Sequence, residues 1–325
     1  LLSRNKSIGA SEVGAIVFGS RWTSNLELWY NKVTGIKNQK CNLRMFLGTQ
    51  TEQLSSEMWE NYDGTEQSIV ENHRKGTPVK KCIDLNSTAY NSEFPWLSAT
   101  PDRTILPWGK FANKNGDGSL EIKNTTGWAI SSYENKLPTE NVIQLVTQMM
   151  CCNYEFGEIF YFIDNSKVQL YSIDKKDTKK VQDVILLHTS KFWDSVEKAR
   201  IVYNKLYESR RTFDMRGAAL LEVELAKLEP DPQTTDAYRD FLTERYKDKI
   251  AKVCIIQGTE DQLMLAREHS KTCAAIKKQE QKKLELEIKL KLAIKDNNVL
   301  DFGKNGKLTY YQNKNGSRLL KNAII

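Results

Sequence analysis

The chain has 325 residues, of which 40% are hydrophobic and 27% charged, a composition typical of a folded globular protein with a sizeable core. No apolar run approaches the length of a membrane helix, and the first residues lack a basic stretch followed by an apolar signal core. The six Cys residues have no compact disulfide spacing, which suits a reducing compartment. We therefore expect a cytoplasmic protein without a membrane partner.

The net charge of +7 is unevenly distributed along the chain. Residues 260–325 hold 14 Lys and Arg against 8 Asp and Glu, whereas residues 1–259 hold 34 against 33. A basic C-terminal region is compatible with a polyanionic partner, but a solvent-exposed helix face rich in Lys would have the same composition. The three His residues stand far apart, so a zinc site has little support, and any metal is expected to be a hard cation held by carboxylates.

Helical periodicity of apolar residues is the commonest pattern in the chain. It predicts helices over residues 11–18, 26–33, 45–62, 141–152 and 176–207. Ser11 is expected to be the N-cap of the first helix, and Gly35 to end the second. Apolar residues alternate strictly between 284 and 294, which is a strand period, but nearly every residue there is a strong helix former and a helix is expected.

Short extended segments are expected where Pro, Gly and Asn interrupt the sequence. They fall at residues 80–85, 96–99, 119–123, 158–162 and 168–172, with hairpin strands at 307–311 and 317–320 around Asn315-Gly316. Helices on both sides of these strands predict an α/β domain over residues 1–212. Residues 213–325 are expected to form a basic, mainly helical extension that ends in the hairpin.

Two acidic motifs carry the chemical signal: Thr100-Pro101-Asp102-Arg103 in a turn, and Leu120-Glu121-Ile122-Lys123 on a strand. Because residues two apart on a strand share a face, Glu121 and Lys123 are expected to project together. An Asp from a neighbouring turn completes a carboxylate pair beside a lysine. Such a set can hold Mg²⁺ and offset the charge that develops when a phosphodiester is hydrolysed. Each motif alone is more often a plain turn or a solvated cross-strand pair.

In their order, these motifs resemble the PD-(D/E)XK nuclease superfamily, specifically the phage recombination exonucleases typified by lambda exonuclease and the YqaJ-type viral recombinases. The resemblance covers about residues 4–165. Four blocks carry it: Ile8 to Val13, Leu47-Gly48 with Glu52, the two acidic motifs, and Gln144, Gln148 and Met149 on the helix that follows. It implies a restriction-endonuclease-like core, in which a central mixed sheet is flanked by helices.

The resemblance implies a role for each matching residue of the metal site. Asp102, Glu121 and Glu52 would be the carboxylate ligands, joined by the main-chain carbonyl of Ile122. Lys123 would be the catalytic lysine. Mg²⁺ is the implied cofactor, with two ions per site, and Mn²⁺ is expected to substitute for it.

The resemblance also implies a pocket for the terminal 5′-phosphate, formed by Arg4, Ser11 and Thr100. Helix N-termini suit such anions because unpaired amides and the helix dipole face them. Gln144 and Gln148 match the active-site helix of the family, but valine replaces the middle glutamine of the family pattern. The alternative is that these two residues have no role in the active site and only form a polar stripe on an otherwise buried helix.

As a whole, the resemblance implies a Mg²⁺-dependent 5′ to 3′ exonuclease that digests linear double-stranded DNA from 5′-phosphorylated ends and leaves 3′ overhangs for recombination. It also implies a ring-shaped homo-oligomer such as a trimer, a single-strand annealing partner, and a phage, prophage or other viral protein acting inside the host cell. Two alternatives remain open: an endonuclease of the same superfamily, of restriction or repair type, and a non-catalytic DNA-binding protein. The basic C-terminal region is expected to contact the DNA backbone or another subunit.

Overall fold

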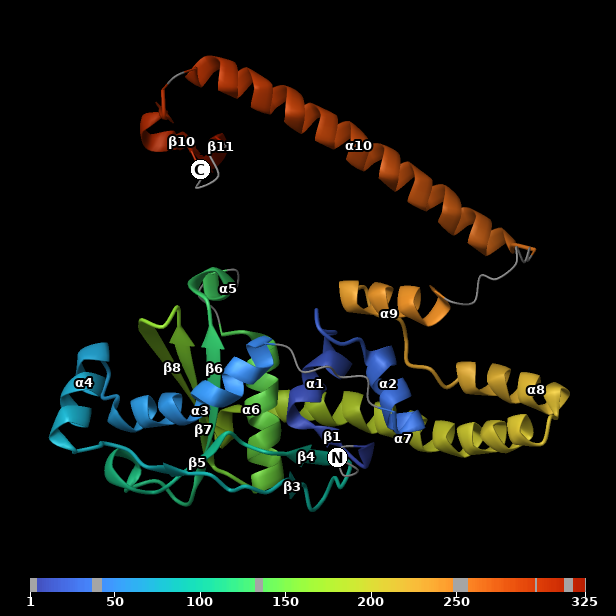
Figure 1. The fold of residues 1–325 in the computed structure, drawn as a ribbon, viewed down its shortest axis with the longest axis horizontal. Helices are drawn as coiled ribbons and strands as arrows, with labels where there is room; N and C mark the ends of the chain where they lie inside the picture. The colour runs from blue at the N-terminus through green and yellow to red at the C-terminus, as the bar shows by residue number, and fades with distance from the viewer. Residues whose placement is uncertain are drawn as a thin grey trace. The chain divides into compact units, whose positions relative to one another are not determined.

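The computed structural model describes residues 5–36, 43–131, 137–247, 257–295, 297–312 and 318–324. The chain forms two compact units, Leu1–Lys249 and Ile250–Ile325 (Figure 1). The division predicted after residue 212 falls between helices α7 (Lys179–Arg211) and α8 (Met215–Ala226), which pack against each other within the first unit.

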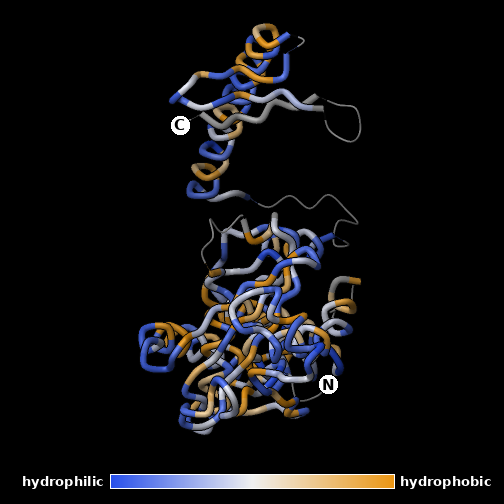
Figure 2. Tube along the Cα trace, turned by 90° about the vertical axis from the view of Figure 1, so that its left-hand side faces the viewer, coloured by the Kyte–Doolittle hydropathy of each residue, from blue (hydrophilic) through white to orange (hydrophobic). Residues whose placement is uncertain are grey.

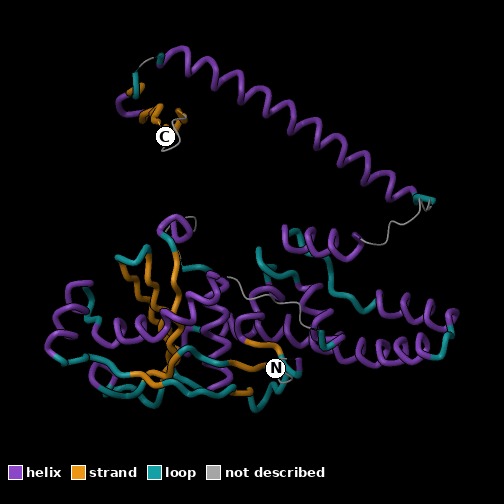
Figure 3. The backbone as a smooth tube through the Cα atoms, viewed as in Figure 1, coloured by secondary structure: helices purple, strands orange, loops and turns teal. Residues whose placement is uncertain are grey.

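A five-stranded mixed sheet forms the centre of the first unit (Figure 3). In spatial order its strands are β2 (Cys82–Ile83), β5 (Arg103–Ile105), β6 (Gly118–Thr125), β7 (Phe156–Ile163) and β8 (Lys167–Asp174). The β6–β7 pair is parallel, and the other neighbouring pairs are antiparallel. Parallel neighbours need a crossover connection, which here contains α5 (Gly127–Ser131) and α6 (Thr139–Cys152).

A smaller sheet joins the beginning of the chain to the region before β5. It has the order β1 (Ile8–Gly9), β4 (Leu97–Ala99) and β3 (Ala89–Tyr90). The first helix, α1 (Ala10–Val17), begins directly after β1, and its N-cap is Gly9. The prediction of Ser11 as N-cap was therefore wrong, because Glu12 accepts the Gly9 amide proton at 2.8 Å and fixes the start of the helix two residues earlier.

Helices cover both faces of the central sheet because its strands are apolar on both sides. On one face, α3 (Leu43–Asn61) contributes Trp59 to a cluster with Leu120 and Phe160. On the other face, α6 contributes Leu145 to a cluster with Ile159. Adjacent residues of β7 thus enter different clusters, as the twofold repeat of a strand requires. A third cluster joins α1, α2 (Asn25–Thr34), α6 and α7.

The helices and strands predicted for the first unit are confirmed, with small shifts at their ends. The second helix ends at Gly35, whose φ of 73° is readily available to glycine. Two short helices, α4 (Glu66–Lys75) and α5, were not predicted. Helices α8 and α9 (Asp236–Tyr246) lie in the region that was expected to be mainly helical, without separate bounds.

The second unit consists of α10 (Glu260–Ile294) and an antiparallel sheet of β9 (Val299–Asp301), β10 (Gly306–Gln312) and β11 (Arg318–Ile324). The helix expected over residues 284–294 is confirmed, and hydrophobic and hydrophilic residues follow one another along α10 in Figure 2. The hairpin is confirmed as β10–β11, and its predicted turn lies outside the described residues. Among the helices described, none is long and apolar enough to cross a membrane.

A charged pair is buried beside Trp59 in the first unit. The Lys80 ammonium is 3.9 Å from Glu158 Oε2 and 4.3 Å from the centroid of the Trp59 ring. Within the described residues, Lys80 Nζ has no hydrogen-bond partner. Burial lowers the pKa of Lys80 to about 8, although Glu158 acts in the opposite direction. The other titratable groups that act on this ammonium are Lys110, Asp63 and Cys82.

The free energy of unfolding is expected to rise as the pH increases from about 8 towards 10.5. In this range the unfolded chain still holds the Lys80 proton, whereas the folded protein has released it. The full pKa difference corresponds to roughly 3 kcal/mol. Urea unfolding of the wild type and Lys80→Met from pH 7 to 10.5 measures the effect, with Lys114→Met, an exposed lysine, as control. The same pH profile in the wild type and Lys80→Met would contradict this prediction.

Candidate active site

The register of β5 and β6 brings the two acidic motifs together. Arg103 pairs with Leu120 in the antiparallel ladder. Asp102, one residue earlier, therefore lies opposite Glu121, one residue later. The Asp102 carboxylate accepts the main-chain N–H of Ile122 at 2.7 Å, which fixes the turn against β6. The two carboxylates are neighbours although they are far apart in sequence.

Lys123 projects from the same face of β6 as Glu121. Its ammonium lies 2.5 Å from Glu121 Oε1, and the Glu121 side chain is only 2% exposed. Burial alone lowers the pKa of Lys123, but the negative charges of Glu121 and Asp102 outweigh this effect and raise the pKa above its ordinary value. Lys123 is therefore a fixed positive charge beside the carboxylate pair.

Helix α6 presents two glutamines to Glu121. Gln144 and Gln148 are four residues apart and thus on the same face of the helix. Gln144 Nε2 donates to Glu121 Oε1 at 2.7 Å, and Gln148 Nε2 donates to Oε2 at 2.5 Å. Gln144 Oε1 accepts from Lys123 at 3.0 Å, and Ser119 lies 2.8 Å from Gln148 Oε1. Both glutamines therefore contact the site, which the sequence alone left open.

Glu52 reaches the site from α3. Its Oε1 accepts a hydrogen bond from Nη1 of Arg103, and the same nitrogen also donates to the carbonyl oxygen of Asp102. Nη2 of Arg103 donates to Gln53 Oε1 at 3.1 Å. Arg103 was not singled out from the sequence, although its place directly after Asp102 was the available signal.

Asp102 and Glu121 form the part of the site that suits a metal. Burial and the neighbouring charge of Glu121 raise the pKa of Asp102 well above its usual range. A divalent cation would relieve this repulsion, and oxygen ligands are those that Mg²⁺ prefers. No three His, Cys, Asp or Glu side chains in the described part of the chain lie close enough together to hold a metal ion. Glu52 is bound to Arg103 instead.

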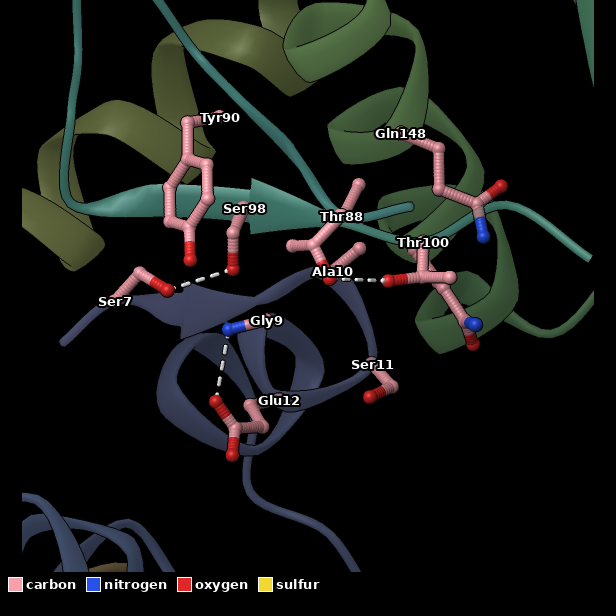
Figure 4. A pocket seen from close by; sticks show the side chains of 12 residues that line it. Ser7, Gly9, Ala10, Ser11, Glu12, Thr88, Tyr90, Ser98, Thr100 and Gln148 are labelled. Carbon is pink, nitrogen blue, oxygen red and sulfur yellow. Dashed lines mark hydrogen bonds between the residues drawn. The ribbon is translucent and has the colours of Figure 1, made fainter. Parts of the chain in front are cut away.

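A pocket opens at the N-terminus of α1 (Figure 4). Its lining is rich in hydroxyl groups, contributed by Ser7, Ser11, Thr88, Tyr90, Ser98 and Thr100. Two of the three residues predicted to bind the 5′-phosphate, Ser11 and Thr100, thus line the same pocket. The Thr100 hydroxyl lies 3.1 Å from that of Thr88. The third predicted residue, Arg4, lies outside the described residues.

The charge of this pocket is nearly balanced. Glu12 lines it, but the carboxylate is 2.7 Å from the ammonium of Lys32, which is buried. The first N–H groups of a helix have no partner within the helix, so α1 offers donors to an anion. Gln144 and Gln148 line the pocket and also contact Glu121. The pocket and the carboxylate pair are therefore adjacent.

The fold and the site together define a PD-(D/E)XK core. The acidic turn precedes β5, the Glu-x-Lys motif lies on the central strand β6, and α6 covers the face on which Glu121 and Lys123 project. Residues 1–155 match the family model described as the YqaJ-like viral recombinase domain. This match confirms the resemblance found in the motifs.

Several solved structures of low sequence identity are also similar to the chain, and three of them follow. LHK-Exo in complex with dAMP is 17% identical, with a TM-score of 0.46 over 66% of this chain and 97% of that chain. The alkaline exonuclease LHK-Exo from Laribacter hongkongensis is 16% identical, with a TM-score of 0.44 over 63% and 96%. A phage-related exonuclease from Haemophilus somnus 129PT is 12% identical, with a TM-score of 0.39 over 59% and 95%. No curated protein matches the chain.

Proposed function

We propose that this protein is a Mg²⁺-dependent exonuclease that digests linear double-stranded DNA in the 5′ to 3′ direction and leaves 3′ overhangs for recombination. The observation that carries the proposal is the convergence of Asp102, Glu121 and Lys123 at one edge of β5 and β6. The viral recombinase family of residues 1–155 is consistent with this role.

Asp102, Glu121 and the Ile122 carbonyl would hold Mg²⁺, with Glu52 as a further ligand. When bound, the metal would polarise the scissile phosphate and lower the pKa of a water molecule. Lys123 would stabilise the charge that develops on the phosphate, because its ammonium is fixed by Glu121 and Gln144. Gln144 and Gln148 would hold the Glu121 carboxylate in one orientation, and α6 would keep bulk water from that side.

The digestion of end-labelled linear duplexes with 5′-phosphate or 5′-hydroxyl termini tests the proposal directly. Rapid release of nucleotides from the 5′-phosphorylated end with Mg²⁺ or Mn²⁺, and no release with EDTA, is the expected result. Covalently closed circular DNA should remain intact under the same conditions. Nicked circles would favour the endonuclease, and DNA binding without any cleavage would favour the non-catalytic protein.

The hydroxyl-rich pocket at α1 is proposed to receive the 5′-phosphate. Substitution of Ser11 by Ala, or of Thr100 by Val, is expected to reduce the preference for 5′-phosphate over 5′-hydroxyl ends about 10-fold each, because each removes one hydrogen bond to a charged group. The ratio of kcat/KM for the two substrates measures this preference. Thr243→Val, at an exposed site on α9, serves as the control. An unchanged ratio in both pocket variants would show that the phosphate binds elsewhere.

The resemblance also motivates three proposals about partners. These are a ring-shaped homo-oligomer, an annealing protein that receives the 3′ strand, and contact of the basic C-terminal region with the DNA backbone or another subunit. The last has a direct test: removal of residues 250–325, which form the second unit, should weaken the salt dependence of DNA binding if that region neutralises phosphates.

A further inference from the structure

The last turns of α10 carry two rows of apolar side chains. Residues four apart share one face of a helix, so the strict alternation between residues 284 and 294 produces two separate rows. The first row is Leu286, Leu290 and Ile294, and its last member is fully buried. The ammonium of Lys291 lies 5.9 Å from the centroid of the Tyr310 ring, so this side of the helix faces β10. The first row therefore ends in the core of the second unit.

The second row lies on a different face of the helix and remains exposed. It consists of Leu284, Ile288 and Leu292, which are 50%, 50% and 68% exposed. Single large apolar residues are common on protein surfaces, but three along one helix face form a continuous apolar strip. Such a strip gains free energy when it is buried against another apolar surface.

Charged residues line both sides of the second row in a regular order. Glu285 and Lys289 each follow a member of the row by one residue, and their charged groups are 2.5 Å apart. Glu287 and Lys291 each precede a member by one residue, and their charged groups are 2.7 Å apart. One residue turns an α-helix by about 100°, so the two pairs lie on opposite sides of the row.

This order of charges distinguishes two ways in which a second copy of α10 could pack on the row. In an antiparallel pair, each side of the row meets the same side of the second copy in reverse order. Glu285 then faces Lys289 of the second copy, and Glu287 faces its Lys291. In a parallel pair, each side meets the opposite side at the same level. Glu285 would then face Glu287, and Lys289 would face Lys291. Flanking charges set the orientation of paired helices in this way, and unlike charges favour the antiparallel pair.

The apolar residues also match one another in the antiparallel arrangement. With a twofold axis at Ile288, this residue faces Ile288 of the second copy, and Leu284 faces Leu292. A twofold contact buries the same surface on both copies, so it leaves no exposed apolar strip on either. The row and its flanking charges therefore fit a second copy of this chain.

We propose that Leu284, Ile288 and Leu292 form a self-association surface, through which two copies of the chain pair by antiparallel packing of the last turns of α10. The contact lies outside residues 1–155, which match the viral recombinase family model. It is also independent of the proposed nuclease activity. The contact spans only a few helical turns, so we expect a reversible association and not an obligate dimer.

Two double variants of equal net charge test the charge pattern in the full chain. Glu287→Lys/Lys289→Glu places like charges opposite each other in the antiparallel pair, and it is expected to weaken self-association roughly 30-fold. Glu287→Lys/Lys291→Glu reverses one side as a whole, so unlike charges still face each other, and the association constant should stay within about 3-fold of the wild-type value. Sedimentation equilibrium at low salt measures the association constants, and circular dichroism measures the helix content.

A pair of single variants tests the apolar contact and provides a measurement if the charge variants lose helix. Ile288→Gln is expected to weaken self-association about 10-fold, because two copies of a half-exposed apolar side chain lose their cover. Ile276→Gln is the matched control. Ile276 is 53% exposed and lies on α10 outside the row, so its substitution should leave the association constant unchanged.

Several outcomes would overturn the inference. An association constant unchanged in both Ile288→Gln and Glu287→Lys/Lys289→Glu would mean that the first unit or another protein covers the row. Equal losses in the two double variants would show that the charges do not select an antiparallel pair. A wild type without self-association at its highest soluble concentration would exclude the surface altogether. A ring formed by the first unit would persist in every variant, so its presence or absence does not affect the comparison.

Discussion

Replacement of Lys123 by Ala is expected to lower kcat for DNA digestion by about 10³-fold or more while the affinity for duplex DNA changes little. The ammonium is held by Glu121 at 2.5 Å and by Gln144 at 3.0 Å, so it is fixed before substrate arrives. A preorganised charge of this kind stabilises the transition state more than the ground state. Single-turnover digestion measures the chemical step, and fluorescence anisotropy measures binding.

Lys114→Ala is the matched control for this experiment. It removes the same charge from an exposed lysine that is paired with Asp174, and such surface pairs contribute little. Its digestion rate should equal that of the wild type within about 2-fold. Full activity in Lys123→Ala would instead favour a structural role for the Glu-x-Lys motif, as in the non-catalytic alternative.

Local periodicity made part of the site predictable. Residues two apart on a strand share a face, so the sequence alone placed Glu121 and Lys123 together, and the ion pair between them agrees. The approach of Asp102 to Glu121 depends on the register of β5 and β6, which is a long-range property. The sequence analysis offered an Asp from a neighbouring turn as the partner carboxylate, and the resemblance to a nuclease family assigned Asp102 and Glu121 to one metal site.

Contacts between distant segments explain what could not be predicted. Arg103 is next to Asp102 in the chain, but the residue it binds, Glu52, lies on α3, 51 residues earlier. Thr88 lies beside Thr100 only because β3 and β4 are paired. The sequence signal for Ser11 as N-cap was misleading for a different, local reason, since the carboxylate of Glu12 bonds to the amide of Gly9 three residues earlier.

Replacement of Asp102 by Asn is expected to have opposite effects on activity and on stability. Activity should fall by about 10³-fold or more, because a neutral amide is a poor ligand for a divalent cation. The metal-free protein should become more stable, because Asn can still accept the Ile122 amide proton at the same place. The substitution removes a charge that burial and Glu121 both disfavour.

The stabilisation is measured as a difference in Tm in the presence of EDTA. Asp102→Asn is expected to have a higher Tm than the wild type under these conditions. Mg²⁺ should then raise the Tm of the wild type but not that of Asp102→Asn, because binding stabilises only a protein that retains the site.

Asp63→Asn changes an exposed carboxylate that is paired with Lys110, and it should respond to Mg²⁺ like the wild type. A metal-free Asp102→Asn protein that is less stable than the wild type would indicate that the Asp102 charge supports the fold. In that case the main role of the acidic turn would be structural. A carboxylate whose role is to bind a cation is expected to be stabilised mainly when that cation is bound.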